Sequence, residues 1–85
     1  MGLAGQFNLK RLKDFIKEYP YYLQEIDKLD NISDLNKNLL KEYLQDDISL
    51  TELAQKYNLS INNCRGHLQT AKHHFVIYLD KVRAK

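Results

Sequence analysis

Residues 49–75, SLTELAQKYNLSINNCRGHLQTAKHHF, have the pattern of a helix, a tight turn and a second helix. Ser49 and Glu52 stand at the spacing of a capping box, in which the serine hydroxyl accepts from a backbone N–H of the first turn and the glutamate reaches back to the cap. The first helix is therefore expected to begin at Leu50. Its inward face, with apolar residues three and four positions apart, consists of Leu50, Leu53, Ala54 and Tyr57.

The residues after this helix predict how the chain turns. Asn58 tolerates the left-handed conformation that ends many helices, and Leu59 is expected to point inward. Ser60 is a preferred N-cap for the next helix. Ala54 supplies the small side chain that two helices need where they cross closely. Together these residues predict two short-linked helices that pack against each other.

The second helix has an apolar seam, because its apolar residues recur alternately three and four positions apart. No proline follows Pro20, so this helix is predicted to run from Ile61 to about Arg83. The seam consists of Ile61, Cys64, Leu68, Ala71, Phe75, Tyr78 and Val82.

Between the seam residues, the first half of the second helix carries polar and basic residues and no acidic one. Asn, Gln and Arg side chains pair in bidentate fashion with base edges in the major groove, and a helix N-terminus favours phosphate. The pattern is typical of a helix-turn-helix DNA reader. The residues concerned are Asn62, Asn63, Arg65, Gly66, His67, Gln69, Thr70 and Lys72.

The distribution of charge supports this interpretation better than the net charge of +2 does. Residues 1–44 hold seven Lys or Arg and seven Asp or Glu, which cancel. From Ser60 to Leu79 there are two Lys or Arg, three His and no acidic residue. Positive potential is therefore expected on the second helix, where DNA contact is predicted.

The segment from about Leu35 to Leu79 resembles region 4 of bacterial sigma factors and the related helix-turn-helix proteins of phages and mobile elements. The resemblance lies in the Ser-Leu-x-Glu-Leu-Ala pattern of residues 49–54, in the Leu59-Ser60 turn, and in Cys64 followed by Ala71. It covers about half of the chain, and it is more specific for helix-turn-helix than for the sigma branch.

The resemblance implies which residues meet DNA. Its base-facing positions fall at Ile61, Asn62, Asn63, Arg65, Gly66 and His67. Residues expected to contact the DNA backbone are Thr51, Ser60, Gln69, Thr70, Lys72, His73 and His74. Asn62, Gly66 and Lys72 depart from the residue types usual in the family, so the base specificity cannot be copied from a relative.

The N-terminal half indicates a helical scaffold. Asn8 is expected to cap a first helix, and Pro20 stops that helix or opens a second, which ends near Asp30 and Asn31. The apolar stripe of the first helix is Phe7, Leu12, Phe15, Ile16 and Tyr19, and that of the second is Leu23, Ile26 and Leu29.

Ser33 is expected to cap a third helix, which ends before a turn at residues 45–47. Its inward face is Leu35 or Asn36, followed by Leu39, Leu40, Tyr43 and Leu44. No strand-like alternation appears, so we expect an all-α fold, a small bundle of about five helices with a C-terminal helix-turn-helix and a long last helix. One domain spans residues 1–85, with a scaffold at 7–32 and a helix-turn-helix unit at 33–83.

The seam of the last helix continues beyond the helix-turn-helix unit. Tyr78, Leu79 and Val82 need an apolar surface to cover them. The helices within residues 7–29 are the favoured partner, because they have apolar stripes of their own. A second subunit in a homodimer is the alternative, since helix-turn-helix proteins often bind two half-sites.

Catalysis, metals and cofactors are not expected. No nucleophile stands beside a base, and no phosphate loop is present. His67, His73, His74 and Cys64 share one helix, which rarely supplies a closed tetrahedral metal site. The single Cys excludes an internal disulfide and fits a reducing compartment. With neither a signal peptide nor a long apolar run, we expect a soluble, cytoplasmic protein without membrane contact.

Two classes of function fit these features. The first is a sequence-specific, double-stranded DNA-binding transcriptional regulator that reads the major groove with the helix beginning at Ile61. The second is a protein-interaction module with a sigma-like fold that binds RNA polymerase or another transcription factor. Tyr19, Tyr21 and Tyr22 are interpreted as core and rim of a helix junction rather than as a stacking platform for single strands.

Overall fold

The computed structural model describes residues 8–45 and 48–83, and every regular element in these ranges is a helix. The predicted all-α bundle with a long last helix is confirmed. Phe7 of the predicted stripe, and Asp46 and Asp47 of the predicted turn, lie outside the described residues. The elements are α1 (Leu9–Glu18), the 3-10 helix η2 (Pro20–Lys28), α2 (Asp34–Gln45), α3 (Leu50–Lys56) and α4 (Ile61–Arg83).

The helix starts follow the predicted caps. Each of the four capping side chains accepts a hydrogen bond from the backbone N–H three residues later, which satisfies a donor that the helix leaves unpaired. The Glu52 carboxylate also accepts from the Ser49 hydroxyl at 3.3 Å. The capping bonds are Asn8–Arg11 at 2.8 Å, Ser33–Asn36 at 3.2 Å, Ser49–Glu52 at 3.1 Å and Ser60–Asn63 at 3.1 Å.

The second helix differs from the expectation in type and length. It is a 3-10 helix that ends at Lys28 rather than near Asp30 and Asn31. Its inward apolar residues are spaced by three only, and a helix with three residues per turn lines up such residues on one side. In an α-helix each of them would be turned by about 60° from the one before. The residues spaced in this way are Leu23 and Ile26 of η2 and Leu29, which follows it.

One cluster of buried residues joins the helices, from Leu12 and Ile16 of α1 to Leu79 of α4. α4 packs against α1, α2 and α3. Phe75 and Leu79 have no exposed surface, and Tyr78 is half-buried. The second half of α4 therefore packs within the chain against the N-terminal helices, as favoured from the sequence.

The structure defines two positions of the core that the sequence left open or placed differently. At the start of α2, Asn36 is the buried residue and Leu35 is exposed. Ile61 is 43% exposed, so the buried seam of α4 begins at Cys64 and not at Ile61. Ile61 is the first residue of the helix, one turn beyond the part of α4 that the core covers.

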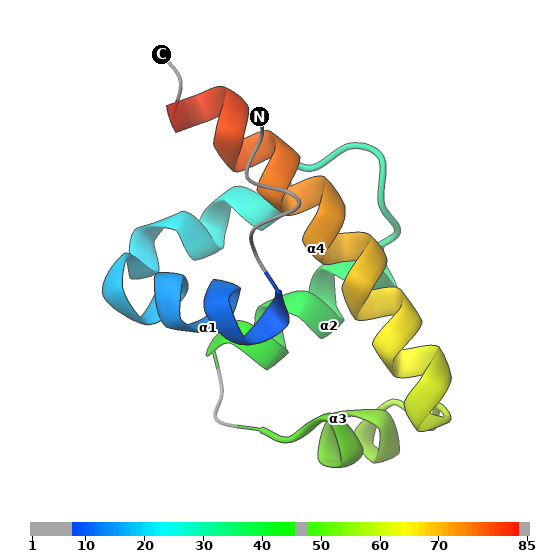
Figure 1. The fold of residues 1–85 in the computed structure, drawn as a ribbon. Helices are drawn as coiled ribbons and strands as arrows, with labels where there is room; N and C mark the ends of the chain where they lie inside the picture. The colour runs from blue at the N-terminus through cyan, green and yellow to red at the C-terminus, as the bar shows by residue number, and fades with distance from the viewer. Residues whose placement is uncertain (1–7, 46–47, 84–85) are drawn as a thin grey trace.

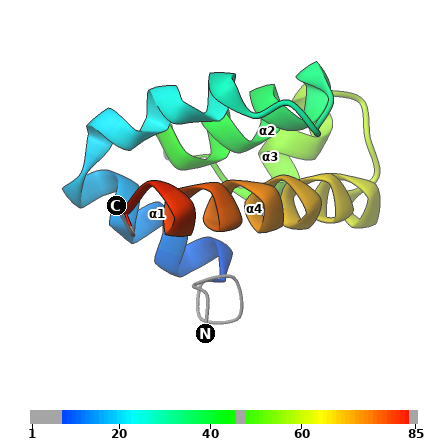
Figure 2. The same cartoon turned by 90° about the horizontal axis from the view of Figure 1, so that it is seen from above.

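The bundle has two distinct ends. α3 and the start of α4 lie at one end, and the corner between α1 and η2 lies at the other (Figure 1, Figure 2). α3 and the start of α4 thus lie away from the corner between α1 and η2 (Figure 2).

Candidate nucleic-acid interface

The turn between α3 and α4 is a Schellman motif. Asn58 adopts the left-handed conformation with φ of 56°, as predicted. The N–H of Leu59 donates to the carbonyl of Ala54 at 2.8 Å, and the N–H of Asn58 donates to the carbonyl of Gln55 at 3.1 Å. These two bonds satisfy carbonyls that the end of α3 would leave unpaired, and they fix where α4 begins.

A polar cluster ties α3 to α2. The Glu42 carboxylate accepts hydrogen bonds from the Lys56 ammonium and the Tyr57 hydroxyl. These bonds hold the pKa of Glu42 below its ordinary value, and the bond to Glu42 raises the pKa of Tyr57 to about 12. The stabilisation from Tyr57 is present below pH 10.0 and is lost as the pH rises towards about 12.

We expect Glu42→Gln to lower the free energy of unfolding by about 1 kcal/mol at neutral pH, because the cluster is partly exposed and solvent screens it. The lowered pKa of Glu42 means that its contribution is present above pH 4.5 and is lost as the pH falls through the folded value. Urea unfolding near neutrality and in acid measures this. The difference in free energy of unfolding between the variant and the wild type should become smaller in acid. An equal difference at both pH values would contradict a stabilising role for the ionised Glu42 carboxylate.

The first half of α4 presents a continuous polar face to solvent. Cys64, Leu68 and Ala71 have no exposed surface and define the side of α4 that faces the core. Successive residues are about 100° apart, so the opposite side passes through Gly66. We call this side, with its neighbours, the outward face. It consists of the exposed residues Asn62, Asn63, Gly66, Gln69, Thr70 and His73.

Four other predicted DNA-contacting residues border the outward face. Arg65 is exposed on one flank, and Lys72 lies two helical turns further along the same flank, half-buried. His67 and His74 lie on the opposite flank, and both are half-buried. Arg65 and His67, which the sequence groups together, are therefore separated by the width of the face.

Two further predicted backbone-contacting residues lie near the helix starts. Thr51 is exposed in the first turn of α3, and Ser60 is exposed at the cap of α4. The Ser60 oxygen already accepts from the N–H of Asn63, which leaves its O–H to donate to a phosphate. No acidic residue lies in the first turn of α4, so no carboxylate there neutralises the partial positive charge of the helix N-terminus.

Gly66 stands at the centre of the outward face, and a Cβ added there would meet no atom within 4 Å. Packing against another described helix therefore does not explain the glycine. We expect Gly66→Ala to raise the free energy of unfolding by about 0.5–1 kcal/mol, since Ala is the better helix former. If α4 enters the major groove, as the resemblance implies, the added methyl group would meet the groove and lower DNA affinity at least about fivefold.

Thermal unfolding and fluorescence anisotropy with a labelled duplex measure the two effects of Gly66→Ala. Asn38→Ala is the matched control, because Asn38 is exposed in the middle of α2 and the change also raises helix propensity. It should stabilise the protein without changing DNA affinity. If Gly66→Ala binds DNA as tightly as the wild type, the groove does not approach α4 at this residue.

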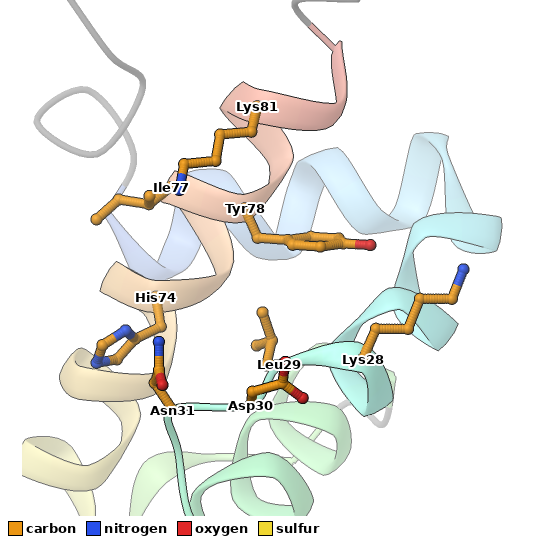
Figure 3. Close-up of a pocket in the computed structure, with 8 residues that line it drawn as sticks. All are labelled: Lys28, Leu29, Asp30, Asn31, His74, Ile77, Tyr78 and Lys81. Carbon is orange, nitrogen blue, oxygen red and sulfur yellow. The ribbon is translucent and has the colours of Figure 1, made fainter.

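A separate cavity of about 260 Å³ lies between segment 28–31 and the second half of α4 (Figure 3). His74 lies beside Asn31 at one end, and Tyr78 lies over Leu29 (Figure 3). His74, which the resemblance places near phosphate, thus lines this cavity. The wall of the cavity mixes lysine, aspartate and apolar side chains, so it does not indicate one chemical class of ligand.

The histidines and the cysteine do not assemble into a metal centre. Within residues 8–45 and 48–83, no three His, Cys, Asp or Glu side chains come together in a group that could hold a metal ion. Cys64 is buried in the core, and this burial raises the pKa of its thiol. The rings of His73 and His74 lie 5.9 Å apart, edge to face.

Comparisons with known proteins found no match, whether to a family model, a curated protein or a solved structure. The resemblance to sigma region 4 therefore rests on the motif residues quoted from the sequence. None of the helices in the described part of the chain combines the length and the apolar character that crossing a membrane requires.

Proposed function

We propose that the protein is a sequence-specific, double-stranded DNA-binding regulator of transcription, with the first half of α4 in the major groove. The observation that carries this proposal is the outward face of α4, which is exposed, polar and free of acidic residues. The exposed face of α1, by contrast, mixes the basic residues Lys10, Arg11 and Lys17 with the acidic residues Asp14 and Glu18. An α-helix fits the major groove, and amide and guanidinium groups match base edges there.

Each predicted contact has a role in this arrangement. Contacts to base edges specify the sequence, and contacts to phosphates on either side of the groove fix the position of the helix. The base-contacting residues are Asn62, Asn63, Arg65, Gly66 and His67. The backbone-contacting residues are Thr51, Ser60, Gln69, Thr70, Lys72, His73 and His74.

Capture of sheared genomic DNA from the source organism, followed by sequencing, tests the proposal. A few sharply enriched sites are expected, and the affinity for such a site should fall steeply with salt because phosphate contacts release counterions. Flat recovery would overturn the proposal. The symmetry of the enriched sites reports whether one or two copies bind, since a dimer reads two half-sites. A regulator of this kind acts in the cytoplasm, where bacterial and phage DNA is transcribed.

A second candidate function is binding to RNA polymerase or another transcription factor. An aromatic cluster at the corner between α1 and η2 favours it, because Tyr21 is 58% exposed and Tyr19 is 38% exposed. The rings of Phe15 and Tyr22 lie against them. Tyrosine is enriched at protein interfaces, and this corner lies at the opposite end of the bundle from α3 (Figure 1). Affinity for such a partner should change little with salt.

A further inference from the structure

The outward face of α4 carries three exposed amide side chains, Asn62, Asn63 and Gln69, and Thr70 beside them. The resemblance assigns Gln69 and Thr70 to the DNA backbone, but both share this exposed face with Asn62, so we assign them to base edges here. Asn and Gln make bidentate hydrogen bonds with N6 and N7 of adenine, and the methyl group of Thr packs against the methyl group of thymine. On the basis of the proposed DNA-binding function, we infer that α4 reads a half-site whose central base pairs are A·T.

The spacing of Asn62 and Gln69 fits two base pairs in one groove that are a few steps apart. Asn62 and Gln69 are seven residues apart, which places them nearly in line on the helix and about 10 Å apart along its axis. That separation equals about three base-pair steps of roughly 3.4 Å each for a helix lying along the groove. Asn63 points about 100° around the axis from Asn62, so it faces a neighbouring pair or the other strand.

Gly66, at the centre of the outward face, is consistent with contacts to base edges by short side chains. An Asn side chain is short, so the backbone of α4 must lie close to the base edges for its amide to reach them. Gly66 lies one turn after Asn62 and one turn before Thr70 on the same face, and the space around it is open. It therefore adds no side chain that would hold the helix away from the groove floor.

The side chains that can pair with guanine lie on a flank of the outward face, apart from the amides. Arg and Lys pair with O6 and N7 of guanine. Residues 61–72 contain one of each, Arg65 and Lys72, and both lie on one flank of the outward face. For a helix lying along the groove this flank faces one strand, so guanines contacted by Arg65 and Lys72 are expected on that strand.

Selection of the full chain on a random duplex library tests this base preference. The expected outcome is one enriched motif with A·T pairs at its centre. A motif with a G·C centre would overturn the inference and leave the proposed function intact. Recovery of no motif would overturn the proposed function and the inference with it.

Amide variants assign the positions within that motif. Asn62→Ala and Gln69→Ala should each weaken binding to the selected site roughly 5- to 150-fold. Asn62→Arg should change the preferred base at one central position from adenine to guanine. Gln24→Ala removes an exposed amide from η2 and is the matched control, which should leave affinity and motif unchanged.

All of these side chains are exposed, so each variant should keep the circular-dichroism spectrum of the wild type. A folded Asn62→Arg protein that selects the unchanged motif would remove Asn62 from the reading residues. A folded Gln69→Ala protein with wild-type affinity would do the same for Gln69. Either result would overturn the amide-based origin of the A·T preference.

Discussion

Leu68→Ala should lower the free energy of unfolding by about 2–5 kcal/mol, a large part of the stability of a domain of this size. Leu68 has no exposed surface and belongs to the single cluster of buried residues that joins α4 to the other helices. Its truncation removes buried methyl groups and leaves a cavity that the neighbouring helices fill only in part. Urea unfolding followed by the helical circular-dichroism signal measures the loss.

Ile61→Ala is the matched control for this prediction. Ile61 stands on the same apolar repeat as Leu68 in the sequence, but it is 43% exposed in the structure. Its truncation should change the free energy of unfolding by about 0.5 kcal/mol or less. If the two variants lost equal stability, the buried seam of α4 would have to extend to its first residue.

Arg65→Ala should weaken specific DNA binding roughly 5- to 150-fold, which corresponds to about 1–3 kcal/mol, while the protein stays folded. Arg65 is exposed on the flank of the outward face, so its side chain is available to DNA and its removal leaves the core intact. Anisotropy on the selected duplex and on a shuffled duplex separates two mechanisms. Loss of a base contact lowers the affinity for the selected duplex alone. Loss of a phosphate contact lowers the affinity for both duplexes and reduces the slope of log affinity against log salt concentration by about 1.

Lys10→Ala removes the same charge from an exposed position in α1 and controls for the overall potential. Its effect on DNA affinity should be small compared with that of Arg65→Ala. Unchanged binding by Arg65→Ala, with an intact circular-dichroism spectrum, would exclude Arg65 from the interface. Equal losses in the two variants would mean that Arg65 acts only through the net charge.

The starts of the four α-helices and the end of α3 were predictable because the interactions that define them are local. Asn8, Ser33, Ser49 and Ser60 each bond to an N–H three residues away. Asn58 ends α3 through its own left-handed conformation. The end of η2 was not predictable in this way, because no side chain caps this helix and it stops at Lys28 rather than near Asp30 and Asn31.

Other features depend on how elements meet in space. Glu42 accepts hydrogen bonds from Lys56 and Tyr57, which lie 14 and 15 residues further along the sequence. No short-range pattern in the sequence indicates these hydrogen bonds. The polar face of α4 and its centre at Gly66 follow from the predicted seam at Cys64, Leu68 and Ala71, which the structure buries. The exposure of Ile61 did not follow from the seam, because it depends on how far the core formed by the other helices extends along α4.

α4 is a single helix of 23 residues, about 35 Å long, with the outward face in its first half and Phe75 and Leu79 in its second. A short peptide of the helix-turn-helix alone would lose most of these tertiary partners, and isolated short helices are marginal in water. If α4 binds DNA as proposed, heat that unfolds the N-terminal helices would also abolish DNA binding. A substitution in α1 that merely loosens its packing would then give a temperature-sensitive allele, although α1 lies outside the proposed DNA-binding face.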